Sequence, residues 1–356
     1  MAATRKPALQ GKVTLKRIAA EIGASISTVS YALSGRTSSA RIAPDKIAEI
    51  KRTAERLGYR PNSAARSIRA GRFGAVALLL RERWGLNHLP GVLTNEIFQT
   101  LETAGQRMMV AHLPFSTQDL AGRGSSLQRE LAVDGLLVTS NEQVPEGYEE
   151  AVDSLHLPVV WVNDRRGSHC VWPDEAAAAK AAVLRLAGLG HRRIGYVHLH
   201  WARSAAKYVA LAHYSVRERR AGFLAGCAAA GVTGLEVIGA DSNDFDGHLQ
   251  GTLAALRAEG RPSALLGYSR YDAELVTAAA RRLGLVIPRD LALTCFDDRQ
   301  ERCGELTQDT IEVPQADCGA RAVGLLLERL ANPALPARSL AIAHRHLPGA
   351  TVAPPS

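Results

Sequence analysis

The sequence predicts a small all-α helix-turn-helix headpiece followed by a two-lobed α/β body in which parallel sheets are flanked by helices. Residues 14–34, TLKRIAAEIGASISTVSYALS, have the pattern of a helix, a tight turn and a second helix. From Phe73 onward, short apolar runs such as GAVALLL and RIGYVHL alternate with stretches of helical periodicity, which is typical of buried parallel strands covered by helices. Because about 280 residues are too many for one such sheet of ordinary size, we expect two lobes with a cleft between them.

The two headpiece helices differ in character. Apolar residues recur at i, i+3, i+4 and i+7 from Leu15 to Ile22, the spacing of a helix that packs on one side. The second helix has only Val29 and Leu33 as obvious anchors, so a polar face stays available to a partner. Such a helix after a tight turn suits a DNA major groove. A third helix is predicted over residues 44–57, with Pro44 in its first turn.

Positive charge is concentrated at the amino end. Residues 1–72 contain 15 Lys and Arg against 4 Asp and Glu, a net charge of +11, whereas residues 73–356 contain 28 against 31, a net charge of −3. A basic module on a mildly acidic body indicates a polyanion at one end and a different partner at the other. A solvated helical face would also account for the charge, but the helix-turn-helix pattern favours DNA.

The spacing of the cysteines and the lengths of the apolar segments indicate the cellular compartment. The five cysteines lie far apart, without a CxxC pair or a Cys/His metal spacing, so we expect buried, reduced thiols and no metal site. No apolar run approaches ~20 residues, and the leading MAATRKPALQGK lacks the apolar segment of a signal peptide. These features predict a soluble intracellular protein.

No enzyme class is indicated. The sequence contains no GxSxG, P-loop or HExxH motif. Asp297 and Asp298 are adjacent carboxylates, but neighbours in sequence point in different directions and make a poor acid–base couple. We therefore expect no catalytic activity and no cofactor.

Several sequence blocks, in order, resemble the lactose-repressor (LacI) family of bacterial transcription regulators. They are VTLKRIAAEIGASISTVSYAL, LGYRPNSAARSIRAGR, LGHRRIGYV, VRERRAGF, IPRDLALTCFDD, and the TxxxP of Thr310–Pro314 before GARAVGLLLERL. The resemblance implies a headpiece, a hinge helix and a body like a periplasmic sugar-binding protein, with three segments crossing between the lobes. It also implies a homodimer that binds a pseudo-palindromic operator in bacterial cytoplasm, in association with the nucleoid.

The expected organisation follows from this resemblance. Residues 1–12 form a disordered basic lead, residues 13–58 the headpiece, residues 59–72 a hinge helix or linker, and residues 73–356 the effector-binding and dimerisation body. The first lobe is expected over about 73–173 and 300–330, and the second over about 174–299 and 331–356.

The resemblance assigns DNA roles by position. Base-reading positions are Ile26, Ser27 and Tyr31, and phosphate-contacting positions are Thr14, Ser25, Thr28 and Ser30. Short hydroxyls can donate to phosphates without reading sequence, while longer side chains on the recognition helix discriminate bases. Tyr31 stands where many members have Arg, so a bidentate contact to guanine is not available there.

The hinge assignment also follows from the resemblance. Ile68 occupies the place of a Leu that wedges into the minor groove at the operator centre, and Ile is an apolar residue of similar size. Ala65, Arg66 and Arg69 accompany it, the arginines as phosphate contacts. The alternative is an ordinary short helix that covers the body.

A ligand cleft is implied between the lobes. Arg219 and Asp297 stand where the family binds ligand hydroxyls or carboxylates, and both residue types suit a hydroxylated ligand. The other positions expected to line the cleft are Thr139, Asn163, Phe245 and Ser269. Alternatively, Asp297 caps a strand end and Arg219 pairs with a helix carboxylate.

The cleft departs from the family pattern. Ser269-Arg270 replaces the usual Asn-Asp pair, and HLPG replaces Asn-Pro-Phe-Phe in the first lobe. The ligand is therefore not expected to be a monosaccharide or purine bound through those missing groups. Sugars or oligosaccharides are the leading class, followed by nucleosides or another metabolite.

The resulting hypothesis is a repressor that a small ligand controls allosterically. Two alternatives remain open: an effector-independent DNA-binding regulator with a vestigial cleft, and a solute-binding protein with the same body fold. The final TVAPPS contains no heptad repeat, so we do not expect a coiled-coil tetramer.

Overall fold

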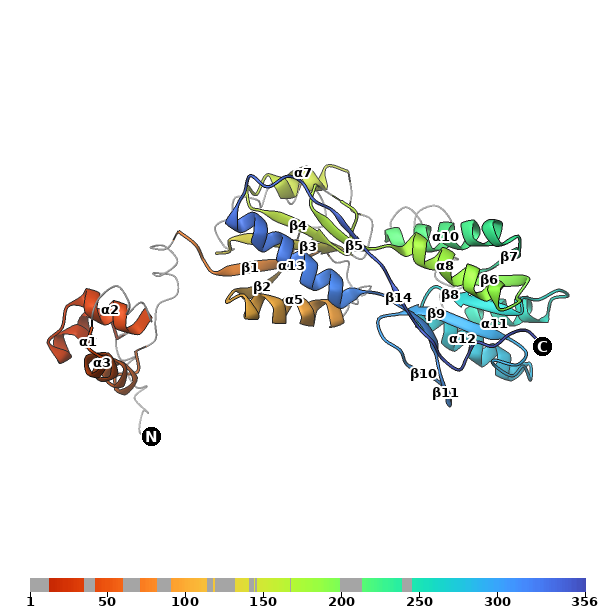
Figure 1. Cartoon of the computed structure of the whole chain (residues 1–356), viewed down its shortest axis with the longest axis horizontal. Coiled ribbons are helices and arrows are strands. Elements are labelled where there is room, and N and C mark those ends of the chain that lie inside the picture. The colour runs from red at the N-terminus through yellow and green to blue at the C-terminus, as the bar shows by residue number, and fades with distance from the viewer. Residues whose placement is uncertain are drawn as a thin grey trace, which may run out of the picture. The chain divides into compact units, whose positions relative to one another are not determined.

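The structure is a computed structural model that divides into two units, Met1–Phe73 and Gly74–Ser356 (Figure 1). It describes residues 13–34, 42–59, 71–81, 91–113, 118, 132–140, 144, 146–166, 168–198, 213–238 and 245–356. Within these residues, no helix combines the length and apolar character that crossing a lipid bilayer requires.

The described residues of the first unit form a headpiece of three helices. Its helices are α1 (Leu15–Ile22), α2 (Ile26–Ser34) and α3 (Pro44–Arg56). Each helix contributes one fully buried side chain to the core: Ile18, Val29 and Ile50. Gly23 ends α1 at φ 61° and donates its backbone N–H to the Ala19 carbonyl, a left-handed conformation that glycine adopts at low cost. On α2 the second buried anchor is Ala32 rather than Leu33, which is only partly buried.

The first lobe of the second unit is a parallel sheet with helices on both faces. The strand order is β13-β5-β4-β3-β1-β2. The strands are β1 (Ala75–Arg81), β2 (Arg107–His112), β3 (Gly135–Ser140), β4 (Val159–Val162), β5 (Cys170–Pro173) and β13 (Leu340–Ile342); the helices are α5 (Gly91–Thr103), α7 (Tyr148–Asp153) and α13 (Gln315–Ala331). Alternate β1 residues face opposite sides, with Val76 and Leu78 under α5 and α13, and Ala77 and Leu79 under α7.

The second lobe repeats this architecture, in the order β14-β12-β9-β8-β6-β7. Its strands are β6 (Arg193–His198), β7 (Thr233–Ile238), β8 (Ala264–Gly267), β9 (Ala292–Asp297), β12 (Asp309–Glu312) and β14 (Arg345–Leu347); its helices are α8 (Glu175–Gly188), α10 (Tyr214–Ala230), α11 (Phe245–Arg257) and α12 (Arg270–Arg282). Helices α8 and α10 cover one face, and α11 and α12 cover the other. Only β14 is antiparallel to its neighbour. A short hairpin, β10 (Arg302–Cys303) and β11 (Leu306–Thr307), follows β9.

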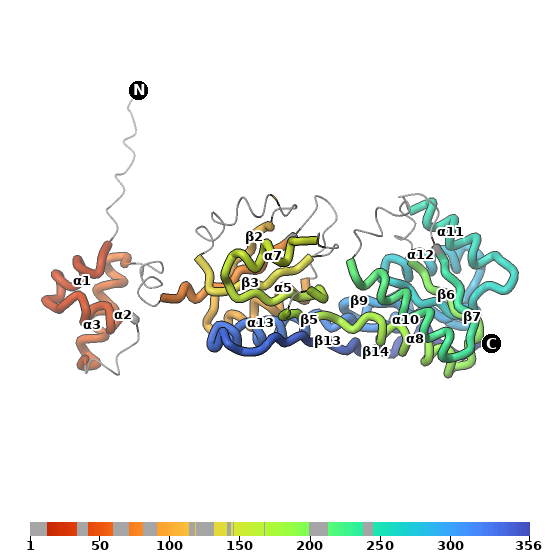
Figure 2. The backbone as a smooth tube through the Cα atoms, turned by 90° about the horizontal axis from the view of Figure 1, so that it is seen from above, coloured from red at the N-terminus to blue at the C-terminus, as the bar shows by residue number. Residues whose placement is uncertain are grey.

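The chain crosses between the lobes three times: after β5, after β12 and after β13. In Figure 2 the blue segment runs from α13 in the first lobe to β14 in the second. The pairing corrects the expected lobe boundaries, because β12 pairs with β9 in the second lobe and β13 pairs with β5 in the first. These strands contain four and three residues, and so short a run does not reveal which sheet it joins.

Helices α8 and α10 pack with their backbones unusually close. A Cβ atom added at Gly222 of α10 would lie 2.2 Å from the backbone oxygen of Ala176 in α8, and one at Gly226 would lie 2.7 Å from Cβ of Val183. No residue larger than glycine fits there without separating the helices. This approach brings Arg219, one turn before Gly222, close to the start of α8.

The Gly222→Ala variant should therefore lower the free energy of unfolding by about 1–3 kcal/mol through overpacking, measured by urea denaturation. Gly324→Ala is the matched control, because Gly324 lies in helix α13 with no atom within 4 Å of an added Cβ. It should be neutral or stabilise by up to about 1 kcal/mol through helix propensity. Equal effects of the two substitutions would contradict the close packing of α8 on α10.

Candidate functional site

Helices α1 and α2 of the headpiece begin with capping hydroxyls. The Ser25 hydroxyl oxygen accepts from the Thr28 backbone N–H at 3.0 Å and lies 2.8 Å from the Thr28 hydroxyl oxygen. The Thr14 oxygen accepts from the Arg17 N–H at 3.4 Å. A helix N-terminus attracts anions through its unpaired N–H groups and its dipole. The Ser25–Thr28 contact uses one hydroxyl proton, which leaves the other to donate to a phosphate oxygen.

The predicted base-reading residues lie on the outward face of α2. Ile26 and Tyr31 are 48% and 43% exposed, and Ser27 is also exposed. The opposite face carries the buried Val29 and Ala32. Ser27 and Tyr31 are four residues apart and therefore neighbours on the helix surface. A largely polar, exposed face with one apolar and one aromatic side chain can contact base edges.

The headpiece also has exposed basic side chains that pair with no carboxylate among the described residues. Lys16 and Arg17 on α1, and Lys51 and Arg52 on α3, are exposed and form no ion pair with a described residue. The hinge residues predicted at Ala65, Arg66, Ile68 and Arg69 lie outside the described residues. The minor-groove wedge thus remains a prediction from the sequence.

In the body, Arg219 forms a buried ion pair with Glu175. Its Nε donates to Oε2 of Glu175 at 2.6 Å and its Nη2 to Oε1 at 2.9 Å, while Nη1 donates to the Tyr268 backbone oxygen at 2.6 Å. Arg219 is 7% exposed and Glu175 is 1% exposed. The guanidinium carbon lies 4.1 Å from the Phe296 ring centroid and 4.7 Å from that of Tyr268. Bidentate bonding and ring contacts fix the guanidinium in one orientation.

The local sequence explains how Glu175 is placed. Asp174 caps α8 by accepting from the Ala177 N–H at 3.2 Å, and the alanine-rich segment after it strongly favours helix. Burial alone would raise the pKa of the Glu175 carboxyl, but the charge of Arg219, the contact with His344 and the hydrogen bonds from Arg219 lower it to about 2. Nε2 of His344, in the last crossover, lies 3.2 Å from the carboxylate.

A chain of hydrogen bonds links this ion pair to the first lobe. The Tyr268 hydroxyl lies 2.9 Å from the Ser215 oxygen, which lies 2.8 Å from Nδ1 of His213; Nε2 of His213 lies 2.8 Å from the Asn163 carbonyl oxygen. Burial lowers the pKa of His213, which favours the neutral ring. Because a carbonyl only accepts, Nε2 carries the proton, Nδ1 accepts from Ser215, and Tyr268 donates to Ser215. Asn163 holds this position with a positive φ of 57°.

The other residues predicted to line a cleft lie at or after the carboxyl ends of parallel strands, where ligands commonly bind in such sheets. Thr139 is the penultimate residue of β3, and its buried hydroxyl has no partner among the described residues. Ser269 caps α12 and donates to Asp272 at 2.6 Å. Asp297 ends β9, and burial raises its pKa. Phe245, the first residue of α11, is 48% exposed.

Arg219 and Asn163 thus belong to one network, whereas the Thr139 hydroxyl has no hydrogen-bond partner among the described residues. The sequence did not identify Glu175, His213, Ser215, Tyr268 and Phe296 as its other members. Glu175 and Arg219 are 44 residues apart, and no motif links them. The only available signal was position, since Glu175 begins a helix directly after a strand and Tyr268 directly follows another.

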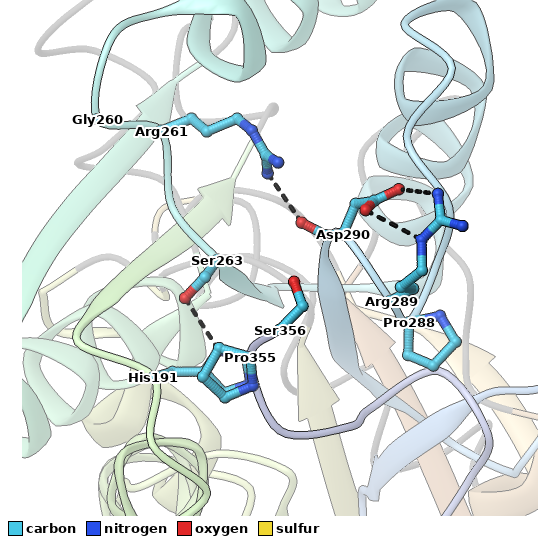
Figure 3. Close-up of a pocket in the computed structure, with 9 residues that line it drawn as sticks. All are labelled: His191, Gly260, Arg261, Ser263, Pro288, Arg289, Asp290, Pro355 and Ser356. Atoms are coloured by element: carbon cyan, nitrogen blue, oxygen red, sulfur yellow. Dashed lines mark hydrogen bonds and ion pairs between the residues drawn. The ribbon is translucent and has the colours of Figure 1, made fainter.

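A separate pocket of about 300 Å³ lies at the amino edge of the second-lobe sheet (Figure 3). Its residues precede β6, β8 and β9 or belong to the carboxyl terminus, and include His191, Arg261, Ser263 and Asp290. Nδ1 of His191 bonds the Ser263 hydroxyl at 2.9 Å, and its Nε2 bonds the Ala353 carbonyl at 3.0 Å. His191 is therefore held structurally. Among the described residues, no group of three or more His, Cys, Asp or Glu has a metal-binding arrangement.

Comparison with known proteins gives matches along most of the chain. Residues 183–352 match the periplasmic binding protein-like domain. The ribose operon repressor of Haemophilus influenzae is 27% identical over 90% of this chain and 92% of its own length. A helix-turn-helix transcriptional regulator of Mycobacterium tuberculosis is 29% identical over the same shares.

Solved structures share the fold. The lac repressor dimer bound to operator and an anti-inducer has a TM-score of 0.75 at 19% identity, and covers 96% of this chain and 99% of its own. A complex of a transcriptional regulator with cellobiose has a TM-score of 0.62 at 21% identity, over 96% of this chain and all of its own. These matches identify a helical headpiece followed by a periplasmic-binding-protein-like body.

The buried carboxylate generates a prediction for acid stability. The folded-state pKa of Glu175, about 2, lies below the ordinary value of 4.5. The stabilisation that its ionised carboxylate gives the folded state is therefore complete above pH 4.5 and is lost as the pH falls toward 2. Glu175→Gln should destabilise the body by about 3–5 kcal/mol at pH 7, and the difference from wild type should shrink below pH 4.5. Urea unfolding between pH 7 and pH 3 measures this difference.

The matched control is Glu236→Gln, which removes a partly exposed carboxylate paired with Arg220. It should cost at most about 1 kcal/mol. A difference between wild type and Glu175→Gln that stays constant from pH 7 to pH 3 would exclude a strongly depressed pKa for Glu175.

Proposed function

We propose that this chain, a member of the lactose-repressor family of transcription regulators, is a sequence-specific DNA-binding repressor controlled by a small ligand. The outward face of α2, with Ile26 and Tyr31 exposed beside the capped start of the helix, carries the DNA assignment. Relatives named as transcriptional regulators, similar over 90% of the chain, support it. The protein would act in the bacterial cytoplasm, on the nucleoid.

The proposed binding mode is that of a homodimer on a pseudo-palindromic operator. Each recognition helix α2 enters the major groove of one half-site, where Ile26, Ser27 and Tyr31 contact bases. The hydroxyls of Thr14, Ser25, Thr28 and Ser30 contact phosphates, with Ser25 at the start of the helix. The hinge supplies Ile68 as a wedge in the minor groove between the half-sites, flanked by Arg66 and Arg69.

We further propose that a carbohydrate binds between the lobes, near Arg219 and Asn163. One structural neighbour is a transcriptional regulator in complex with cellobiose, and another is a LacI-family transcriptional regulator with bound ribose. The network from Tyr268 through His213 to Asn163 spans both lobes, so a ligand there can favour one lobe spacing over another. Binding at two sites that each prefer one global state couples ligand to operator affinity.

One observation favours a second candidate function, that of an effector-independent regulator. The guanidinium of Arg219 is already bonded to Glu175 and Tyr268 within the protein. A cleft stabilised by its own side chains can hold one conformation without a ligand.

Operator recognition is testable by selection from a random pool of DNA duplexes. The enriched sequence should be roughly palindromic and bind at least about 10³-fold more tightly than an unrelated duplex at physiological salt. Tyr31→Ala should weaken this specific binding about tenfold or more, through lost base contacts, while nonspecific affinity stays unchanged. Electrophoretic mobility or fluorescence anisotropy at fixed salt measures both constants.

Ser30→Ala is the matched comparison on the same helix, since it removes a hydroxyl assigned to phosphate. It should lower specific and nonspecific affinity by the same factor. An equal loss on both duplexes for Tyr31→Ala would remove its assignment as a base reader, and failure to enrich any sequence would contradict the proposed function.

Ligand control is testable with a carbohydrate library that includes ribose and cellobiose. An effector should raise the melting temperature, because it binds the folded state, and should change operator affinity about 5–150-fold. A ligand that stabilises the protein without changing operator affinity is not its effector. A library without any active member would favour the effector-independent candidate.

A further inference from the structure

We propose that the amino edge of the second-lobe sheet contains a further ligand site, which binds a compact anion carrying phosphate groups. The site is the pocket of Figure 3, with a volume of about 300 Å³, at the lower end of the range for small-molecule sites. Arg219 lies at the opposite, carboxyl edge of the same sheet, where it bonds Tyr268 after β8. The inference goes beyond the proposed function and does not rest on it.

Three neighbouring strands bring the pocket together. Strands β9, β8 and β6 are adjacent and parallel, so the segments that enter them lie side by side at one edge. The Ser263 N–H donates to the Arg193 carbonyl at 3.0 Å, and the Ala292 N–H donates to the Ser263 carbonyl at 2.9 Å. The described residues include every segment that enters these three strands. The charges at this edge of β6, β8 and β9 can therefore be counted.

The pocket lies in a strongly basic part of a mildly acidic body. Segments 188–193, 257–263 and 281–290 contain seven arginines against two carboxylates, a net charge of +5, whereas residues 73–356 as a whole have a net charge of −3. The arginines, all exposed or partly exposed, are Arg192, Arg193, Arg257, Arg261, Arg281, Arg282 and Arg289; the carboxylates are Glu259 and Asp290. Such a concentration of one charge sign attracts anions.

Helix dipoles account for only some of these arginines. Arg257, Arg281 and Arg282 lie in the last turns of α11 and α12, where the helix dipole stabilises a cation. Arg193 is the first residue of β6, and Arg261 lies between α11 and β8. No helix end explains these two positions.

Two guanidinium groups beside the pocket are available to an anion. The Asp290 carboxylate is already matched by Arg289, whose Nε and Nη2 donate to its two oxygens at 3.1 and 2.9 Å. Arg261 reaches only the backbone oxygen of Asp290, from Nη1 at 2.9 Å (Figure 3). The Arg193 guanidinium packs on Gly260 in the pocket wall, with Nη2 2.6 Å from a Cβ added there. Neither Arg261 nor Arg193 forms an ion pair with a described residue.

These donors suit phosphate in a compact ligand. A guanidinium presents paired N–H groups that match two oxygens of a phosphate, and four of the five N–H groups of Arg261 have no acceptor among the described residues. Two unpaired cations are balanced by a phosphate dianion or a diphosphate better than by a single carboxylate. Pro288 and Pro355 add apolar walls. A walled pocket favours a small ligand over a nucleic-acid strand, which follows an open basic groove.

The test titrates the full chain with inorganic diphosphate at a constant ionic strength of about 0.15 M, where the Debye length is about 8 Å. Wild type, Arg261→Gln and Arg257→Gln are compared by isothermal titration calorimetry. Both substitutions remove one positive charge from the same edge, but Arg257 does not line the pocket. Arg261→Gln should weaken diphosphate binding at least about tenfold through lost charge-assisted bonds, and Arg257→Gln at most about twofold.

Diphosphate bound by the headpiece is common to all three proteins, so their difference reports on the body. Equal losses in the two variants would show attraction by the whole edge, as a nucleic-acid surface would give, and would overturn the inference. A wild-type protein that binds no diphosphate overturns it as well.

A second variant covers the case in which Arg261→Gln does not fold. Arg193 is exposed, so Arg193→Gln removes the other unpaired cation without disturbing the core. It should weaken diphosphate binding at least about fivefold. A loss no larger than that of Arg257→Gln contradicts the proposed site.

Discussion

The body of this protein depends on the buried ion pair between Glu175 and Arg219. Its formation requires α8 and α10 to approach closely, which Gly222 permits. The guanidinium also needs the Tyr268 carbonyl and the Phe296 ring. Partial separation of a buried ion pair is unfavourable, because it leaves each charge desolvated and unpaired. The carboxyl edge of the second-lobe sheet is therefore a rigid platform.

The platform lies where the lobes are connected. Glu175 begins α8 directly after the first crossover, and His344, 3.2 Å from its carboxylate, belongs to the third. Two connections that are 169 residues apart in sequence thus meet at one charged group. His213 extends the same network to the Asn163 carbonyl in the first lobe. Relative motion of the lobes changes this hydrogen bond before it disturbs the ion pair, because the bond spans the lobes and the pair lies within one.

Local sequence pattern predicted the headpiece helices well, but it did not predict pairs between residues that are distant in sequence. The third helix, expected over 44–57, spans Pro44–Arg56, because its proline, periodicity and following glycine are all local signals. Central strands such as β1 and β6 were also visible as apolar runs. Strands β12 and β13 were assigned to the wrong lobes, since pairing depends on distant partners. The alternative expected for Arg219, a pair with a helix carboxylate, is what the structure shows, but the sequence did not identify Glu175 as that carboxylate, because a long-range ion pair has no sequence spacing of its own.

The neutral balance of the Glu175–Arg219 pair also bears on how a ligand could act. A ligand that contributes only hydrogen bonds changes the energy of a site modestly, by about 0.5–1.5 kcal/mol for each bond. Allosteric couplings of about 1–3 kcal/mol therefore correspond to a few such bonds that exist in one lobe arrangement and not in the other. The bond between His213 and Asn163 spans the lobes, whereas the ion pair does not. In the proposed function, the ligand would thus control operator affinity through polar contacts between the two lobes. The ion pair would hold the second-lobe side of those contacts in a fixed position.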